Sequence, residues 1–185
     1  DINARRNLEI TEKLRDKSKK GTLLWVLDKT STSMGGRLVR RWLNDPLIDK
    51  TEINERLDAV EELKDSIILR GDVIEALKKV YDIERLAGKI SYGNANGRDL
   101  ISLKNSVKQL PDIKKVLATT GSKLLRNIYE ELDTLDDIYA LVEKAIVEEP
   151  PIGVKDGGLI KVGYDPEIDK LKLATTEGKK WIIEL

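Results

Sequence analysis

The sequence predicts a mainly α-helical protein of several helices, with one small β-hairpin near its C-terminal end. Leu, Ile and Val recur at spacings of three and four along most of the chain, which is the period of a helix with one buried face. Stretches rich in Gly, Pro, Asn and Asp separate these periodic segments. A chain of 185 residues can bury about 70% of the surface that it exposes when unfolded, so we expect a real hydrophobic core.

A first helix is predicted over residues 33–43. Met34, Leu38 and Trp42 lie four residues apart on one face, Thr30 and Thr32 each offer an N-terminal cap, and Pro46 ends the segment.

Gly35 and Gly36 stand in the first turn of this helix, where each weakens it by roughly 1 kcal/mol relative to Ala. Their presence predicts a close approach by a neighbouring element, or a hinge. Trp25 and Trp42 are expected to anchor the core.

The middle of the chain is predicted to be a series of helices packed by their aliphatic faces. One starts at Thr51, buries a stripe through Ile53, Leu57 and Val60, and ends at a break at Gly71–Asp72. Another follows the Tyr81–Asp82 step, and residues 93–97 form the clearest internal loop. The longest helix is expected over residues 123–149, where Pro150–Pro151 stops it.

The period changes after these prolines. Residues 152–155 and 159–163 are predicted to form two short strands around the turn Asp156–Gly157–Gly158. A last helix then opens at Asp165 or Pro166 and contains Trp181.

The composition excludes several classes of chemistry. The chain has no Cys and no His, which removes disulfides, the usual zinc ligands and the imidazole base of nucleophile pairs. Lys plus Arg and Asp plus Glu each number 33, so we expect no attraction of the whole molecule to a polyanion. No apolar run approaches the ~18 residues of a membrane span, and the first residues are not a secretory signal. We therefore expect a cytoplasmic protein that does not contact a membrane.

Candidate binding sequences are weak. Gly121–Ser122–Lys123 and Gly178–Lys179–Lys180 resemble the end of a phosphate-binding loop, but each lacks the Gly five positions earlier. The basic run between residues 13 and 20 could contact DNA phosphates, yet it has no aromatic residue to stack a base, so a solvated loop is favoured. Arg37 and Arg41 share one helix face, and ion pairs inside the domain or to a neighbour are favoured over DNA contact. The sequence predicts no catalytic, cofactor-binding or metal-binding residue.

Several stretches, in order, resemble one known family. These are the segment GTLLWVLDKTSTSMGGRLVRRWLNDPL over residues 21–47, ERLDAVEEL over 55–63, YDIERL over 81–86, GNANGRDL over 93–100, and DGGLIKVGYDPEID over 156–169. Together with Arg5, Arg6 and Asn7 near the start, they resemble the core, or lever, domain of the MutS family of DNA mismatch-repair ATPases. The similarity covers essentially the whole chain, with residues 118–145 the least distinctive.

The resemblance implies a multihelical fragment that carries no catalysis of its own. In that family the lever helices join the ATPase module to a clamp that grips DNA, so residues 1–163 would be the first segment of the core and residues 164–185 the start of the long lever helix. The longer protein would bind ATP and Mg, bind mismatched double-stranded DNA through other domains, form a homodimer and act with a MutL-type partner. This chain has neither a Phe-x-Glu mismatch-reading motif nor a Walker loop.

The resemblance and the glycine pattern together suggest residues for a mechanical role. Arg5, Arg6 and Asn7 are candidate interdomain contacts, while Gly35, Gly36, Gly157 and Gly158 are candidate hinge or packing positions. The alternative is a free-standing helical module that binds a partner protein through an exposed apolar helix face.

Overall fold

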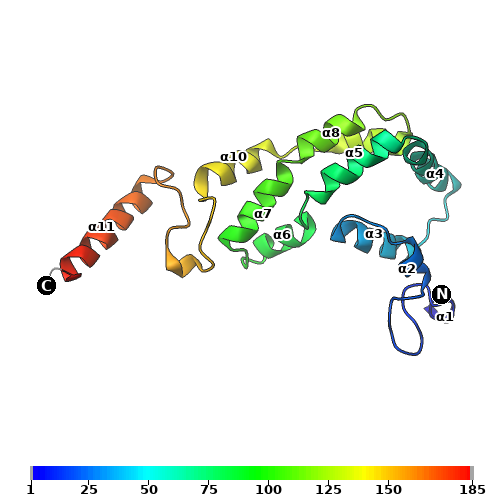
Figure 1. Ribbon diagram of the computed structural model, residues 1–185, viewed down its shortest axis with the longest axis horizontal. Helices are drawn as coiled ribbons and strands as arrows, with labels where there is room; N and C mark the ends of the chain where they lie inside the picture. The colour runs from blue at the N-terminus through cyan, green and yellow to red at the C-terminus, as the bar shows by residue number, and fades with distance from the viewer. Residues whose placement is uncertain (1, 184–185) are drawn as a thin grey trace.

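The computed structural model describes residues 2–183, with side chains placed for residues 3–175 apart from Arg5. The fold is mainly helical, and its elements form an elongated body (Figure 1). In chain order they are α1 (Ile2–Asn7), α2 (Leu23–Leu27), α3 (Ser33–Asn44), α4 (Lys50–Asp65), α5 (Ile67–Lys78), α6 (Ile83–Ser91), α7 (Gly97–Val107), α8 (Leu110–Leu117), α9 (Lys123–Glu131), α10 (Asp136–Ala145), the 3-10 turn η1 (Val154–Asp156) and α11 (Pro166–Ile183).

The helices follow one another along the long axis. The α4, α5 and α8 helices lie at one end, α6, α7 and α10 lie in the middle, and α11 projects from the other end (Figure 1). The α1–α3 segment lies beneath the α4–α5 end, so the two chain termini are far apart. Among the described residues, no helix is both long and apolar enough to cross a membrane.

The core consists of three apolar clusters in series. One joins α4, α8 and α9 through Ala59, Leu117 and Leu125. The central cluster is built from α6, α7 and α8, with Leu86, Leu103, Val107 and Leu110 buried. The third surrounds the end of α10, where Val142, Ala145 and Ile146 are buried. Ile113 packs against the first two clusters, so the apolar contacts run on from one to the next.

Local capping explains where several helices begin. The Thr32 side chain accepts a hydrogen bond from Gly35 N, which starts α3 where the sequence predicts it. Asp82 caps α6 in the same way through Arg85 N. Asn96 and Asp99 form a reciprocal capping box at the start of α7, which begins at Gly97, the last residue of the predicted loop. The last helix begins at Pro166, also as predicted.

The prediction of one helix over residues 123–149 is wrong. The α9 helix ends at Glu131, and α10 begins at Asp136 after Leu135, which has a left-handed backbone with φ of 53°. Asp133 accepts a hydrogen bond from Leu135 N at 2.9 Å, a local side-chain bond that competes with the helix. The break allows Leu132 and Leu135 to pack against the central cluster.

The predicted break at Gly71–Asp72 is also wrong, because α5 runs through both residues. The break lies at Ser66, whose side chain caps α5 through Leu69 N at 3.3 Å.

The predicted β-hairpin is not found in the described part of the chain. Residues 154–156 form η1, where Gly153 N donates to Asp156 Oδ2 at 3.0 Å. Ile160 instead forms an antiparallel bridge with Ile146, just after α10. This pairing is preferred because Ile146 leaves the helix with an extended backbone, and the bridge places Ile160 against the apolar cluster around it.

Two predictions of burial are wrong as well. Trp25 is 47% exposed and Trp42 is 38% exposed, because α2 buries Leu24 instead and α3 buries no residue. On α4, Leu57 and Val60 are each 58% exposed, whereas Ala59 faces the core. The predicted position of Trp181 in the last helix holds, but its side chain lies outside the described ones.

Candidate functional site

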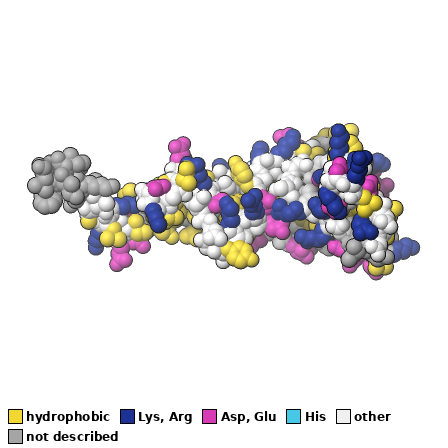
Figure 2. Space-filling model, turned by 90° about the horizontal axis from the view of Figure 1, so that it is seen from below, with side chains coloured by type: hydrophobic (Ala, Val, Ile, Leu, Met, Phe, Trp, Pro, Cys, Tyr) yellow, Lys and Arg dark blue, Asp and Glu magenta, His cyan; other side chains and the backbone are white. Residues whose placement is uncertain are grey.

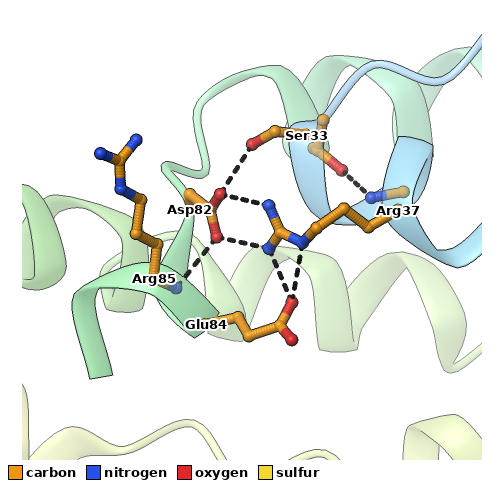
Figure 3. A network of polar contacts seen from close by, with 7 residues as sticks. Ser33, Arg37, Asp82, Glu84 and Arg85 are labelled. Atoms are coloured by element: carbon orange, nitrogen blue, oxygen red, sulfur yellow. Dashed lines mark hydrogen bonds and ion pairs between the residues drawn. The ribbon is translucent and has the colours of Figure 1, made fainter. Parts of the chain in front are cut away.

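A network of ionic contacts fastens α3 to the helical body (Figure 3). The Arg37 guanidinium donates from Nη1 to Asp82 Oδ2 at 2.7 Å and from Nη2 to Asp82 Oδ1 at 2.8 Å. It also donates to Glu84 Oε2, at 2.6 Å from Nη2 and 3.2 Å from Nε. Such a bidentate pairing fixes the orientation of the two groups as well as the distance between them. Residues about 45 positions apart in the chain are thereby joined.

Asp82 is held in place from three directions, which makes it a well-ordered anchor. Besides Arg37, it accepts hydrogen bonds from Ser33 Oγ at 3.0 Å and from Arg85 N at 3.1 Å (Figure 3). The paired guanidinium of Arg37 holds the pKa of Asp82 well below its usual range, and Asp82 in turn raises the pKa of Arg37. Both groups are therefore charged at any physiological pH.

The next contact connects α6 to α7. Tyr81 N, one residue before Asp82, donates to Ser106 Oγ at 2.9 Å, and Ser106 Oγ donates to Ser102 O at 2.8 Å. Ser106 is completely buried. A buried hydroxyl with both a donor and an acceptor role satisfied ties the start of α6 to one position on α7.

Charged side chains connect α7 to α10, and α10 to the segment before α11. Lys104, whose side chain is only 8% exposed, donates to Glu143 Oε2 at 2.7 Å. Lys161 donates to the backbone oxygen of Glu143 at 2.5 Å and lies 3.5 Å from Glu143 Oε1. The two lysines hold the pKa of Glu143 below its usual range, Lys104 having the larger effect. Glu143 thus holds α7, α10 and the segment before α11 together.

The base of α11 is attached to the same place. Lys161 N donates to Ala145 O at 2.8 Å, and Lys172 Nζ of α11 donates to Ile160 O at 2.6 Å. Asp169 of α11 accepts from Gly163 N at 2.7 Å. Contacts therefore run without interruption from α3, through α6, α7 and α10, to α11.

A second set of contacts holds the α4 end. The Arg56 guanidinium of α4 lies 3.9 Å from the centre of the Trp42 ring of α3, within the range of a cation–π contact. Glu62 accepts from Gly121 N at 2.6 Å and Ser122 N at 2.9 Å, just before α9. A carboxylate of this chain thus occupies the amide donors that a phosphate would need, which argues against a phosphate site there.

The residues predicted for a mechanical role do not come together in one site. Arg6 and Asn7 are exposed on α1, and the Arg5 side chain lies outside the described ones. A Cβ on Gly35 would lie 3.1 Å from Thr32 Oγ1 and 3.2 Å from Thr30 Cβ, both in the segment that leads directly into α3. The three atoms nearest to a Cβ on Gly36 are side-chain oxygens of Thr30 and Asp28.

Gly157 and Gly158 follow η1 in the segment between α10 and α11, away from the α1–α3 end of the body (Figure 1). Both have positive φ, and nothing lies within 4 Å of a Cβ built on either of them. A hinge or packing role for these glycines remains a prediction.

Sequence reasoning missed most of the contacts described above. It predicted that Arg37 makes ion pairs but did not name Asp82 or Glu84 as partners, and it overlooked Lys104 and Glu143. The cap position of Asp82 was a usable signal, because a helix-capping carboxylate has a fixed position in which an Arg can pair with it. No local signal indicates Glu143, since its partners lie 39 and 18 residues away.

Comparison with known proteins shows which family the chain belongs to. A family model described as MutS domain III matches residues 3–181, nearly the whole chain. The chain belongs to the MutS domain III family. Proteins named DNA mismatch repair protein MutS are 54% identical to it in Alkaliphilus oremlandii, and 55% identical in Ruminiclostridium cellulolyticum and in Clostridium kluyveri. Each match covers all 185 residues.

The chain spans about a fifth of the length of these relatives, 21% of each. The family model and these relatives confirm, over the whole of this chain, the resemblance to the MutS family that the sequence indicated. This MutS domain III is mainly helical, and in its described part no group of three or more metal-ligating side chains comes together.

Proposed function

We propose that this MutS domain III is the mechanical element of a DNA mismatch-repair protein, coupling an ATPase module to a clamp that grips DNA. The domain performs no reaction itself in this proposal. The observation that supports it is the unbroken series of contacts from Arg37 on α3 to Lys172 on α11. Helices joined in this way move as bodies, so a displacement at one end is carried to the other.

The proposal also assigns the two ends of this series of contacts to parts of the longer protein. Residues 1–163 form the core segment, and residues 164–185 begin the lever helix that leads towards the clamp, which fits the way α11 projects from the body (Figure 1). Arg5, Arg6 and Asn7 are proposed as contacts to a neighbouring domain. ATP and Mg would bind in another domain of the full-length protein, which would act in the cytoplasm as a homodimer on mismatched double-stranded DNA with a MutL-type partner.

The test removes the first contacts in the series, those that Arg37 makes. In the full-length protein, Arg37→Ala removes the contacts to Asp82 and Glu84, so we expect ATP-induced release from a mismatched duplex to slow several-fold while ATP hydrolysis stays near its original rate. Release is followed by stopped-flow fluorescence of labelled DNA, and hydrolysis by phosphate production.

Arg40→Ala is the matched control, because Arg40 is an exposed Arg on the same helix. Arg6→Ala is expected to behave like Arg37→Ala if α1 contacts a neighbouring domain. Equal losses of hydrolysis and release in Arg37→Ala would overturn the coupling role.

One observation favours the alternative, a module that binds a partner protein. Leu57 and Val60 share an exposed face of α4, and Ile67 and Ile68 at the start of α5 are also exposed. An apolar surface of this kind is typical of a protein interaction site.

A further inference from the structure

Gly97, the first residue of α7, is surrounded more tightly than any other glycine with described surroundings. A Cβ built on it would lie 2.3 Å from Leu159 Cδ1 and 2.6 Å from Pro150 Cβ. Real Cβ atoms essentially never come this close to another heavy atom. Only a residue without a side chain leaves room for Leu159 and Pro150 at this position.

The backbone at Gly97 is not free to retreat from these side chains. Asn96 and Asp99 form the capping box on either side of it, and Asp99 is also paired with Lys89 Nζ at 2.7 Å. The Lys89 ammonium holds the pKa of Asp99 below its usual range, so this carboxylate stays charged. Any added side chain at residue 97 must therefore displace Leu159 and Pro150, which lie on the other side of the contact.

Leu159 is directly connected to the base of α11. Its carbonyl oxygen accepts from Val147 N at 3.1 Å, and the next residue, Ile160, forms the bridge to Ile146. The Ile160 carbonyl oxygen in turn accepts the hydrogen bond from Lys172 on α11. A displacement of Leu159 is thus passed to α11 across a few covalent and hydrogen bonds.

The predicted hinge glycines lie outside the contacts that connect Leu159 to α11. Gly157 and Gly158 belong to the loop from 148 to 158, and both ends of this loop adjoin the bridge between Ile146 and Ile160. An open groove of about 730 Å³ lies between this loop and α11. Bending at the two glycines can move the loop without moving α11.

We propose that Gly97 is a socket that receives Leu159 and Pro150 and so sets the direction in which α11 leaves the body. Gly97 is a positioning residue in this proposal, and α11 is a rigid extension of the α7–α10 pair rather than a helix hinged at Gly157–Gly158. The proposal deepens the coupling function and rests on it for its consequence in the full-length protein. An α11 of 18 residues is about 27 Å long, so a tilt of about 5° at its base moves its far end by about 2 Å.

The test measures the direction of α11. Because the chain has no Cys, two spin labels can be attached at Asn105→Cys on α7 and Thr175→Cys on α11, and their separation measured by pulsed electron spin resonance. We expect Gly97→Ala to shift the mean separation or broaden its distribution by about 1 Å or more, because Thr175 lies about 14 Å along α11 and a 5° tilt moves it by about that much. Hydrogen exchange at Val147 N and Lys161 N should also quicken, while exchange in α4 stays unchanged.

Gly88→Ala in α6 is the matched control, because nothing lies within 4 Å of a Cβ at that position. Adding Leu159→Ala to Gly97→Ala removes the nearest clash and should restore part of the original distribution. If Gly97→Ala does not fold, Leu159→Ala alone empties the socket and should broaden the distribution. Distributions in Gly97→Ala, or failing that in Leu159→Ala, that match the unsubstituted chain would overturn the proposal.

A separate measurement distinguishes this proposal from the coupling function. In the full-length protein, Gly97→Ala should slow ATP-induced DNA release but not ATP hydrolysis. If the spin-label separation shifts and release is unchanged, the socket stands and the coupling function is contradicted.

Discussion

At the scale of single residues, the stability of the α3 attachment depends on charge geometry more than on burial. No residue of α3 is buried, so the ion pairs of Arg37 and the Trp42–Arg56 contact contribute much of the attachment of this helix to the body. Exposed ion pairs contribute little when both partners are mobile. Here Asp82 is fixed as a helix cap and receives two parallel hydrogen bonds, which is the geometry in which such a pair is effective.

The lowered pKa of Asp82 predicts a pH dependence. A carboxylate whose pKa is lower in the folded than in the unfolded state stabilises the fold above its unfolded pKa of about 4, and loses this effect as the pH falls through the folded pKa. We expect Asp82→Asn to be less stable than the unsubstituted chain at pH 7, with the difference shrinking steadily below pH 4. Urea unfolding of both proteins at several pH values checks this. A difference that stayed constant down to pH 2 would show that Arg37 does not discriminate between the two side chains by charge.

At the scale of helices, the same residue type has opposite roles in different surroundings. Gly71 lies inside α5 with nothing within 4 Å of an added Cβ, whereas Gly97 has two side chains directly against it. Sequence patterns treat both glycines as breaks in the helical period. The difference between them is visible only when the neighbours from distant parts of the chain are in place.

Gly71→Ala is therefore expected to stabilise the protein. Ala reduces the backbone entropy of the unfolded chain and meets no atom in the folded one, so the free energy of unfolding should rise by about 0.5–1 kcal/mol. Thermal or urea unfolding followed by circular dichroism measures it. Destabilisation would mean that α5 does bend or break at Gly71.

At the scale of the whole molecule, the slender shape limits how much apolar surface the chain covers alone. Its three clusters follow one another along the long axis, and charged groups of both signs lie among hydrophobic side chains on the face seen in Figure 2. Exposed Leu and Val on α4 and Leu on α11 remain uncovered by described parts of the chain. An apolar surface of this kind favours association.

We accordingly expect the chain to self-associate at high concentration, and Leu57→Lys with Val60→Lys on α4 to reduce that association. Sedimentation velocity over a range of concentrations measures it. Ser91→Lys with Asn94→Lys adds the same charge at two exposed positions, the end of α6 and the connection to α7, and serves as the control. A chain that stayed monomeric at every concentration would contradict the expectation. It would also weaken the case for a partner-binding module.

Local signals were enough to predict the helical class, the starts of α3, α6 and α11, and all but the last residue of the 93–97 loop, because caps and prolines act on their immediate neighbours. They were also enough to show the family, since its motifs lie in order along the chain. They could not predict the split between α9 and α10 or the Ile146–Ile160 bridge, because Leu135 and Ile160 gain their stability from apolar clusters formed by other helices. The partners of Arg37 and Glu143 and the crowding at Gly97 likewise arise only when segments 18 to 62 residues apart meet in space.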